Sequence, residues 1–143
     1  KGITASLNIS STLSTYNKAK KMFNKVGMVI ELKKEQEMDT FTGLIGSGPA
    51  YFFYLLKAYE KRLIKLCNND SALTAKAMSG LLEGVALSLE DGSSIDDLIK
   101  KVASKKGTTE AGLKSFKKNK LLSSFDKGIS AAVNRSKEIA NES

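Results

Sequence analysis

Residues 71–91 restrict the fold of this chain more than any other segment, because they are apolar on almost every face of the helix they predict. Small residues recur within the segment at Ala77, Gly80, Gly84 and Ala86. Glycine inside a helix costs roughly 1 kcal/mol relative to alanine, so its repetition favours close approach of another backbone. A helix that is apolar all round must be covered on several sides. We therefore place it at a subunit interface, with a core helix buried inside a monomer as the alternative.

Residues 1–34 show the pattern of a strand, a helix and a second strand. Apolar and polar residues alternate over 3–9, helical spacing follows over 16–26, and 28–32 is a short apolar run. Gly27 stands where a helix C-terminal glycine is expected. A helical crossover predicts parallel strands, and parallel sheets are nearly always larger than two strands. We expect this unit to be the last part of a doubly wound domain that begins upstream.

Residues 35–143 show helical periodicity and no further strand signal, so the fold is predicted to be mainly α. Glycines interrupt the pattern between 43 and 48, and Pro49 suits the first turn of the next helix. Asn69 or Asp70 is expected to cap the helix after that one, and Ser94 begins a capping-box pattern. The later helices are expected at 71–91, 94–103, 109–116 and 121–140.

The composition excludes several classes of site. The sequence has no histidine and one cysteine, Cys67, which excludes a zinc site and a histidine-dependent triad. A single unpaired thiol suits a reducing cytoplasm. No run of 18 residues lacks a charge and no signal pattern begins the sequence, so we expect a cytoplasmic protein without a membrane span.

The net charge of +8 raises the question of nucleic-acid binding. The positive charges are nearly all lysines spread along the chain, and no aromatic residues are interleaved with them. Solvated helix faces explain this pattern better, so no nucleic-acid partner is expected.

Residues 46–51 belong to a glycine cluster that begins at Gly43 and has the order G-x-x-G-x-G. A dinucleotide fingerprint requires G-x-G-x-x-G between a strand and a helix. We therefore interpret the cluster as a sharp entry into a packed helix.

Residues 104–109 precede a predicted helix start. The exposed N–H groups of a helix N-terminus suit a carboxylate or a phosphate, and Lys105 and Lys106 add positive charge. The alternative is ordinary capping of the helix by Thr108 or Thr109.

Taken together, these segments resemble the pyrroline-5-carboxylate reductase family. Residues 46–51 match the family pattern S-G-S-G-P-A-Y from its first glycine onward, and 104–109 are similar to its S-P-G-G-T-T loop. Residues 131–138 look like the last helix of the family, and 2–5 look like a late strand of its nucleotide-binding domain.

The resemblance implies both a fold and a function. The family reduces a small cyclic imine, 1-pyrroline-5-carboxylate, to L-proline with hydride from NADPH or NADH. It joins an N-terminal Rossmann domain to a helical domain that interlocks into homodimers, which often assemble further. By this resemblance residues 1–34 are the end of the Rossmann-type domain, and 35–143 are the dimerisation and substrate-loop domain.

The resemblance also assigns residues to the site. Ser104, Gly107, Thr108 and Thr109 would bind the substrate carboxylate, and Thr109 is the candidate donor of the proton that the imine nitrogen gains. No residue of the chain is assigned to a metal.

Two departures from the family stand out. Lys105 and Lys106 replace its proline and glycine, and neither G-x-G-x-x-G nor G-x-G-x-x-A occurs in the sequence. We therefore expect no cofactor to bind this chain alone, and we expect a separate N-terminal dinucleotide-binding half as a partner. The alternative is a catalytically inactive helical oligomerisation module.

Overall fold

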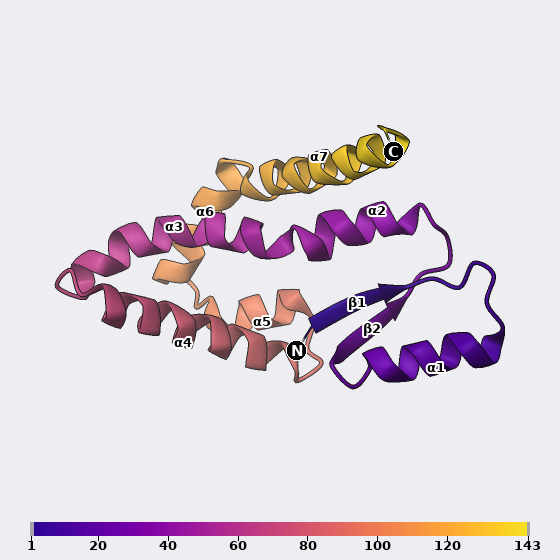
Figure 1. Ribbon diagram of the computed structural model, residues 1–143. Helices are drawn as coiled ribbons and strands as arrows, with labels where there is room; N and C mark the ends of the chain where they lie inside the picture. Colours follow the sequence, from indigo (N-terminus) through magenta and orange to yellow (C-terminus); the bar gives the residue numbers. More distant parts are fainter. Residues whose placement is uncertain (1, 143) are drawn as a thin grey trace. The chain divides into compact units, whose positions relative to one another are not determined.

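The computed structural model describes residues 2–142, which form two compact units. One unit contains Lys1–Ala50 and Asp126–Ser143, and the other contains Tyr51–Phe125. A short sheet begins the chain and helices make up the remainder (Figure 1). The expectation of a mainly α fold after a strand–helix–strand segment is confirmed.

The first unit begins with two parallel strands, β1 (Gly2–Ser6) and β2 (Gly27–Glu31), joined by helix α1 (Leu13–Phe23). The sheet has these two strands within the described residues. Tyr16 of α1 ties the unit together, because its hydroxyl lies 2.7 Å from Ser6 Oγ and donates to Glu31 Oε2 at 3.1 Å. Parallel pairing through a helical crossover agrees with the sequence pattern.

Gly27 has a different role from the one expected. Helix α1 ends at Phe23, and Asn24 is its C-cap, so Gly27 begins β2 instead of ending the helix. It pairs in register with Gly2, and a Cβ at Gly27 would lie 2.0 Å from the carbonyl oxygen of Gly2. Strand pairing therefore requires the glycine. The first strand is also shorter than predicted and ends at Ser6.

The glycine cluster does not break the chain into a loop. Helix α2 (Glu37–Phe41) continues into a π-helical turn, η1 (Thr42–Gly46), before helix α3 (Gly48–Leu66) begins. The N–H of Ser47 donates to the carbonyl of Thr42 at 2.9 Å, five residues back. Pro49 lies in the first turn of α3, as predicted.

The last helix, α7 (Leu121–Glu142), packs on this bulge. A Cβ at Gly43 would lie 2.5 Å from Val133 Cγ2 and 3.1 Å from the Val133 backbone nitrogen. Ser136 Oγ donates to Asp39 Oδ1 at 2.7 Å, across 97 positions of sequence. Gly43 therefore permits a close approach of two helices, which explains why a glycine stands inside a helical segment.

The second unit contains a helical hairpin of α3 and α4 (Ser71–Leu89). Asn68 and Asn69 turn the corner in the left-handed conformation, with φ of 53° and 63°. Asn tolerates this conformation better than most residues. Asp70 then caps α4 by accepting the N–H of Leu73 at 2.9 Å. Buried Thr74 adds a bond from its hydroxyl to the Asp70 carbonyl at 2.6 Å.

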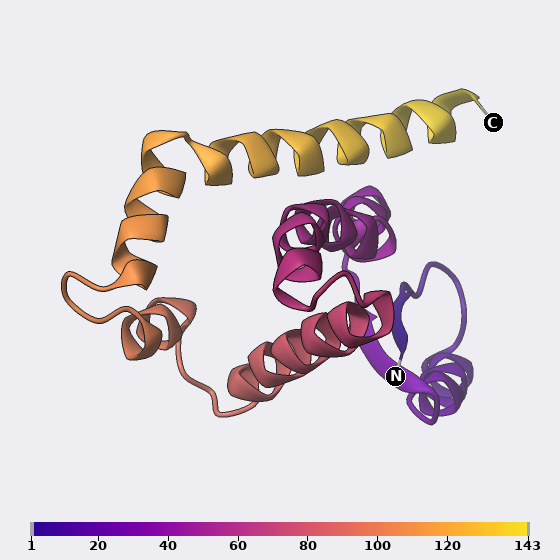
Figure 2. The ribbon, with the colours of Figure 1, turned by 90° about the vertical axis from the view of Figure 1, so that its left-hand side faces the viewer.

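Helices α5 (Ile95–Val102) and α6 (Thr108–Lys118) follow the hairpin. Figure 2 shows α6 in orange, and Phe116 of this helix lines a groove of about 510 Å³ together with Tyr59 and Leu63 of α3. The ring of Phe125 returns to the start of α3, with centroids 6.0 Å from Tyr51 and 6.3 Å from Phe52.

The described residues bury very little apolar surface within the chain. Cys67 is the one large apolar side chain that is buried among residues 2–142. On α4, Leu73, Val85 and Leu87 are 50%, 54% and 60% exposed. The alternative of α4 as a core helix of a monomer is therefore wrong for this structure.

Helix α4 is also long and apolar enough to cross a membrane by length and composition alone. Core helices of soluble proteins pass the same test, so it assigns no membrane to the chain.

Candidate functional site

Residues 104–107 form a tight turn before α6. The N–H of Gly107 donates to the carbonyl of Ser104 at 3.0 Å, which closes a four-residue turn. The third residue of the turn, Lys106, has φ of 61°, and the second, Lys105, is not among the residues with positive φ. This is the pattern of a type II turn, which favours proline at its second and glycine at its third position. The two lysines therefore occupy the positions that a Pro-Gly pair suits best.

Gly107 is required by its distance from Ser104. A Cβ at Gly107 would lie 2.3 Å from Ser104 Oγ and 3.0 Å from the Ser104 carbonyl oxygen. The Ser104 hydroxyl thus lies directly beside the backbone that enters the helix. The structure brings these two predicted site residues into contact.

The N-terminus of α6 lacks a side-chain cap. Gly107 is the N-cap residue, and no side chain bonds the first turn at this position. Thr108 and Thr109 are the first two residues of the helix, and both are exposed. The alternative, ordinary capping of the helix by Thr108 or Thr109, is therefore wrong. The first N–H groups of a helix have no partner inside it, so this end offers donors and a partial positive charge to an anion.

Glu110 is the residue of this loop that the sequence analysis missed. Its Oε2 accepts the N–H of Lys106, and its Oε1 pairs with Lys114 Nζ at 2.9 Å. The Lys114 ammonium, together with the Lys106 N–H, holds the pKa of Glu110 below its usual value. The spacing from Gly107 to Glu110 is that of a capping box, and this is the signal that points to Glu110.

The other singled-out segment, 46–51, lies at the junction of η1 and α3. Gly48 is buried, and the element directly before η1 is helix α2, not a strand. Its geometry is that of a packed helix junction, as expected.

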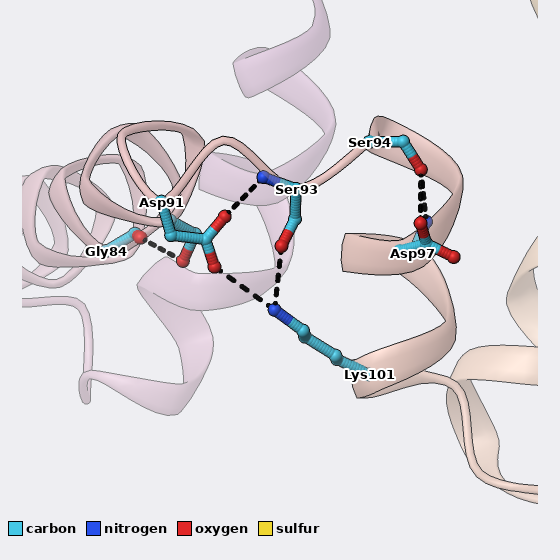
Figure 3. A network of polar contacts seen from close by, with 7 residues as sticks. Gly84, Asp91, Ser93, Ser94, Asp97 and Lys101 are labelled. Carbon is cyan, nitrogen blue, oxygen red and sulfur yellow. Dashed lines mark hydrogen bonds and ion pairs between the residues drawn. The ribbon is translucent and has the colours of Figure 1, made fainter.

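Figure 3 shows a polar network at the corner between α4 and α5. Asp91 accepts the N–H of Ser93 at 2.7 Å and the Lys101 ammonium at 3.1 Å. These contacts lower the pKa of Asp91 to about 2, with the Ser93 N–H as the largest cause. Ser94 caps α5 through the N–H of Asp97 at 3.2 Å, as the capping-box pattern predicts. The network holds the two helices at a fixed corner.

An apolar groove of about 590 Å³ lies between these two helices. Gly80 and Gly84 line the groove from α4, and Ile95 and Ile99 line it from α5. A Cβ at either glycine would meet nothing within 4 Å inside the chain. The repeated glycines of α4 therefore face an open groove.

Among residues 2–142, no cluster of three histidine, cysteine or acidic side chains has the arrangement of a metal site.

The family described as pyrroline-5-carboxylate reductase dimerisation matches residues 35–139, which is most of the chain. The chain belongs to the pyrroline-5-carboxylate reductase family. The matched range contains the turn at 104–107, the α4–α5 groove and the packed helix junction. The resemblance of the sequence motifs to this family is thereby confirmed.

Curated pyrroline-5-carboxylate reductases are similar in sequence. The protein of Pseudomonas aeruginosa is 30% identical over 141 residues, which cover 99% of this chain and 51% of that protein. Pyrroline-5-carboxylate reductase 1 of Bacillus spizizenii is 35% identical over 109 residues, or 76% of this chain and 37% of that protein. The chain thus spans about half the length, or less, of these relatives.

Solved pyrroline-5-carboxylate reductases have the same fold. The Coxiella burnetii enzyme is 31% identical with a TM-score of 0.77, over 94% of this chain and 51% of that one. The Plasmodium falciparum enzyme, solved with NADP bound, is 24% identical with a TM-score of 0.78, over 94% and 52%.

Proposed function

We propose that this chain supplies the dimerisation domain and the substrate-carboxylate loop of a pyrroline-5-carboxylate reductase. The observation that carries the proposal is the uncapped N-terminus of α6 behind the Ser104–Gly107 turn. A planar carboxylate accepts hydrogen bonds from the N–H groups of such a helix end. Ser104, Thr108 and Thr109 add hydroxyl donors around it, and Lys105 and Lys106 add positive charge.

Anchoring the carboxylate is itself a contribution to catalysis. A cyclic imine held by its carboxylate has fewer orientations, so its reactive carbon is presented to the hydride in one direction. Thr109 is the second residue of α6 and so lies in the first turn at this helix end. We propose that it donates or relays the proton that the imine nitrogen gains.

The hydride in this reaction comes from NADPH or NADH. We assign no residue of this chain to that cofactor, because the sequence lacks the glycine fingerprint that holds a pyrophosphate. We propose instead that an N-terminal dinucleotide-binding half, with its own nucleotide site, works with this domain in the cytoplasm.

The second part of the proposed function is dimerisation through α4. Its exposed leucines and the α4–α5 groove form an apolar surface that one chain leaves uncovered. Exposed patches of this kind mark association sites. A second copy of the chain would cover the groove and complete a core, and dimers built in this way often assemble further.

The deciding experiment joins this chain to the dinucleotide-binding half of the Pseudomonas aeruginosa relative. NADPH oxidation is then measured with 1-pyrroline-5-carboxylate as substrate. Thr109→Val should lower kcat by about tenfold or more, because general acid catalysis contributes 10²–10⁴-fold. Thr109→Ser, the matched control, keeps the hydroxyl and should retain most of the activity. Equal rates for the Val and Ser variants would contradict the role of Thr109.

A catalytically inactive oligomerisation module is the second candidate, favoured by the two lysines in the loop. It predicts a stable dimer and no NADPH oxidation by the chimera. Activity restored by Lys105→Pro with Lys106→Gly would identify those lysines as the cause of inactivity.

A further inference from the structure

Glu110 makes two contacts that lead in opposite directions. Its Oε2 reaches back to the N–H of Lys106 inside the turn, and its Oε1 reaches forward to Lys114 Nζ, one helical turn later. The first contact crosses from the helix to the loop that precedes it. Glu110 therefore connects the shape of the turn to the first turn of α6.

The turn needs such a restraint. Lys106 has φ of 61°, a left-handed conformation that is unfavourable for a side chain such as lysine. Proline at position 105 would fix φ there and glycine at 106 would accept the positive φ, but this chain has lysine at both. The turn has one backbone bond of its own, from Gly107 to Ser104.

Glu110 is also placed so that its charge is balanced. A carboxylate at the N-terminus of a helix would repel the carboxylate of a substrate bound there. Lys114 Nζ lies 2.9 Å from Oε1, and this ion pair offsets the negative charge. The Glu110 carboxylate can hold the turn without strongly opposing an incoming anion.

We propose that Glu110 is a positioning residue for the substrate loop. By accepting the N–H of Lys106, it holds residues 104–107 in the turn that a Pro-Gly pair would otherwise enforce. Its effect on ligand binding rests on the proposed function, whereas its effect on the turn does not. Its role depends on the two lysines, and a chain with Pro-Gly at 105 and 106 would not need it.

The test is a double-mutant cycle in the full chain. Glu110→Ala is made in the natural background and in Lys105→Pro/Lys106→Gly, and amide hydrogen exchange at residues 106 and 107 is followed by NMR. The residue 106 N–H bonds Glu110 itself, whereas the Gly107 N–H donates to Ser104 and reports on the turn. In the natural background the exchange rate at residue 107 should rise about fivefold, because the turn that holds its bond to Ser104 loses the restraint from Glu110. In the Pro-Gly background the change should be less than about twofold, because the turn is already restrained.

L-proline, the product of the proposed reaction, serves as the binding probe in the same four proteins. Glu110→Ala should weaken L-proline binding about fivefold in the natural background, and Pro-Gly should restore it. Lys114→Met, the matched control, removes the other partner of Glu110 and should leave exchange at residue 106 close to that of the natural chain. Circular dichroism checks that α6 is retained in every variant.

The outcomes separate the two proposals. If no protein binds L-proline, the proposed function fails, and the exchange rates alone decide the role of Glu110. Unchanged exchange at residue 107 in Glu110→Ala, or an equal change at residue 107 in both backgrounds, would overturn that role.

Discussion

The space beside the backbone of Gly107 is filled by the side chain of Ser104, so no side chain can be added at position 107 without displacing it. The Cβ that alanine would add at 107 would lie 2.3 Å from Ser104 Oγ and 3.0 Å from the Ser104 carbonyl oxygen. At the scale of single residues, the candidate site is therefore a contact between a hydroxyl and bare backbone, followed by a helix without a side-chain cap.

Gly107→Ala should weaken L-proline binding about tenfold, because Ser104 must rotate away and one oriented hydrogen bond is lost. Calorimetric titration measures the change. Gly112→Ala is the matched control, because Gly112 lies in the same helix and a Cβ there would meet nothing within 4 Å. It should raise the free energy of unfolding by about 1 kcal/mol and leave binding unchanged. Equal affinities for the two variants would mean that Ser104 takes no part in binding.

Some single-residue roles were predictable from the sequence and others were not. Asp70 and Ser94 stand directly before helical patterns, so their capping roles are local and were found. The roles of Gly27 and Gly107 depend on the residue that each one approaches. Strand pairing places Gly27 against Gly2, and the turn at 104–107 places Gly107 against Ser104. Glu110 was missed because its contact with Lys106 exists only once the turn has formed.

The corner between α4 and α5 belongs to the scale of elements. Two helices are held there by Asp91 at the end of one and Lys101 within the other, with the Ser93 N–H between them. This corner also sets the shape of the apolar groove, because the groove is lined from both helices.

The corner should show a pH dependence with a definite sign. The pKa of Asp91 is lowered to about 2, so the charged carboxylate is favoured in the folded state. Its stabilising effect is fully present above its ordinary value near 3.8 and is lost as pH falls through about 2. NMR titration of the Asp91 carboxyl should give this low value, and Lys101→Met should raise it only in part, because the Ser93 N–H is the larger cause. A titration near 3.8 in the natural chain would mean that the corner is not held in this way.

Most element positions followed from periodicity, since 3.6-residue spacing is a local property of the sequence. The π-helical turn η1 did not, and its Gly43 lies against Val133, about ninety residues later in the sequence. In the sequence alone, the glycines of this segment predict an interruption of the helix. In the structure the segment is helical, and Gly43 packs closely against Val133 of α7.

At the scale of the whole molecule, the chain buries little of its own apolar surface. The sequence predicted that α4 must be covered, because a helix that is apolar all round cannot remain in water. The sequence did not reveal that no other part of the described chain covers the apolar side chains of α4, because burial depends on how all the elements pack.

Gly84→Leu should separate chain folding from association. Inside one chain the new side chain meets open space at its Cβ, so a single chain tolerates it. In a dimer that closes over the α4–α5 groove it overpacks the interface, which costs about 1–3 kcal/mol and weakens the dimer roughly 5- to 150-fold. Sedimentation equilibrium measures the dissociation constant, with Gly128→Leu on α7 as the matched glycine outside the groove. Identical constants for both variants would remove the groove from the interface.

The uncovered face of α4 also has a kinetic consequence. If a second chain completes the core, the final step of folding is bimolecular, and its rate rises with the square of the concentration of folded precursors. The same exposed leucines promote aggregation while that partner is awaited. Refolding yield is therefore expected to pass through a maximum as protein concentration increases, with slow pairing below it and precipitation above it.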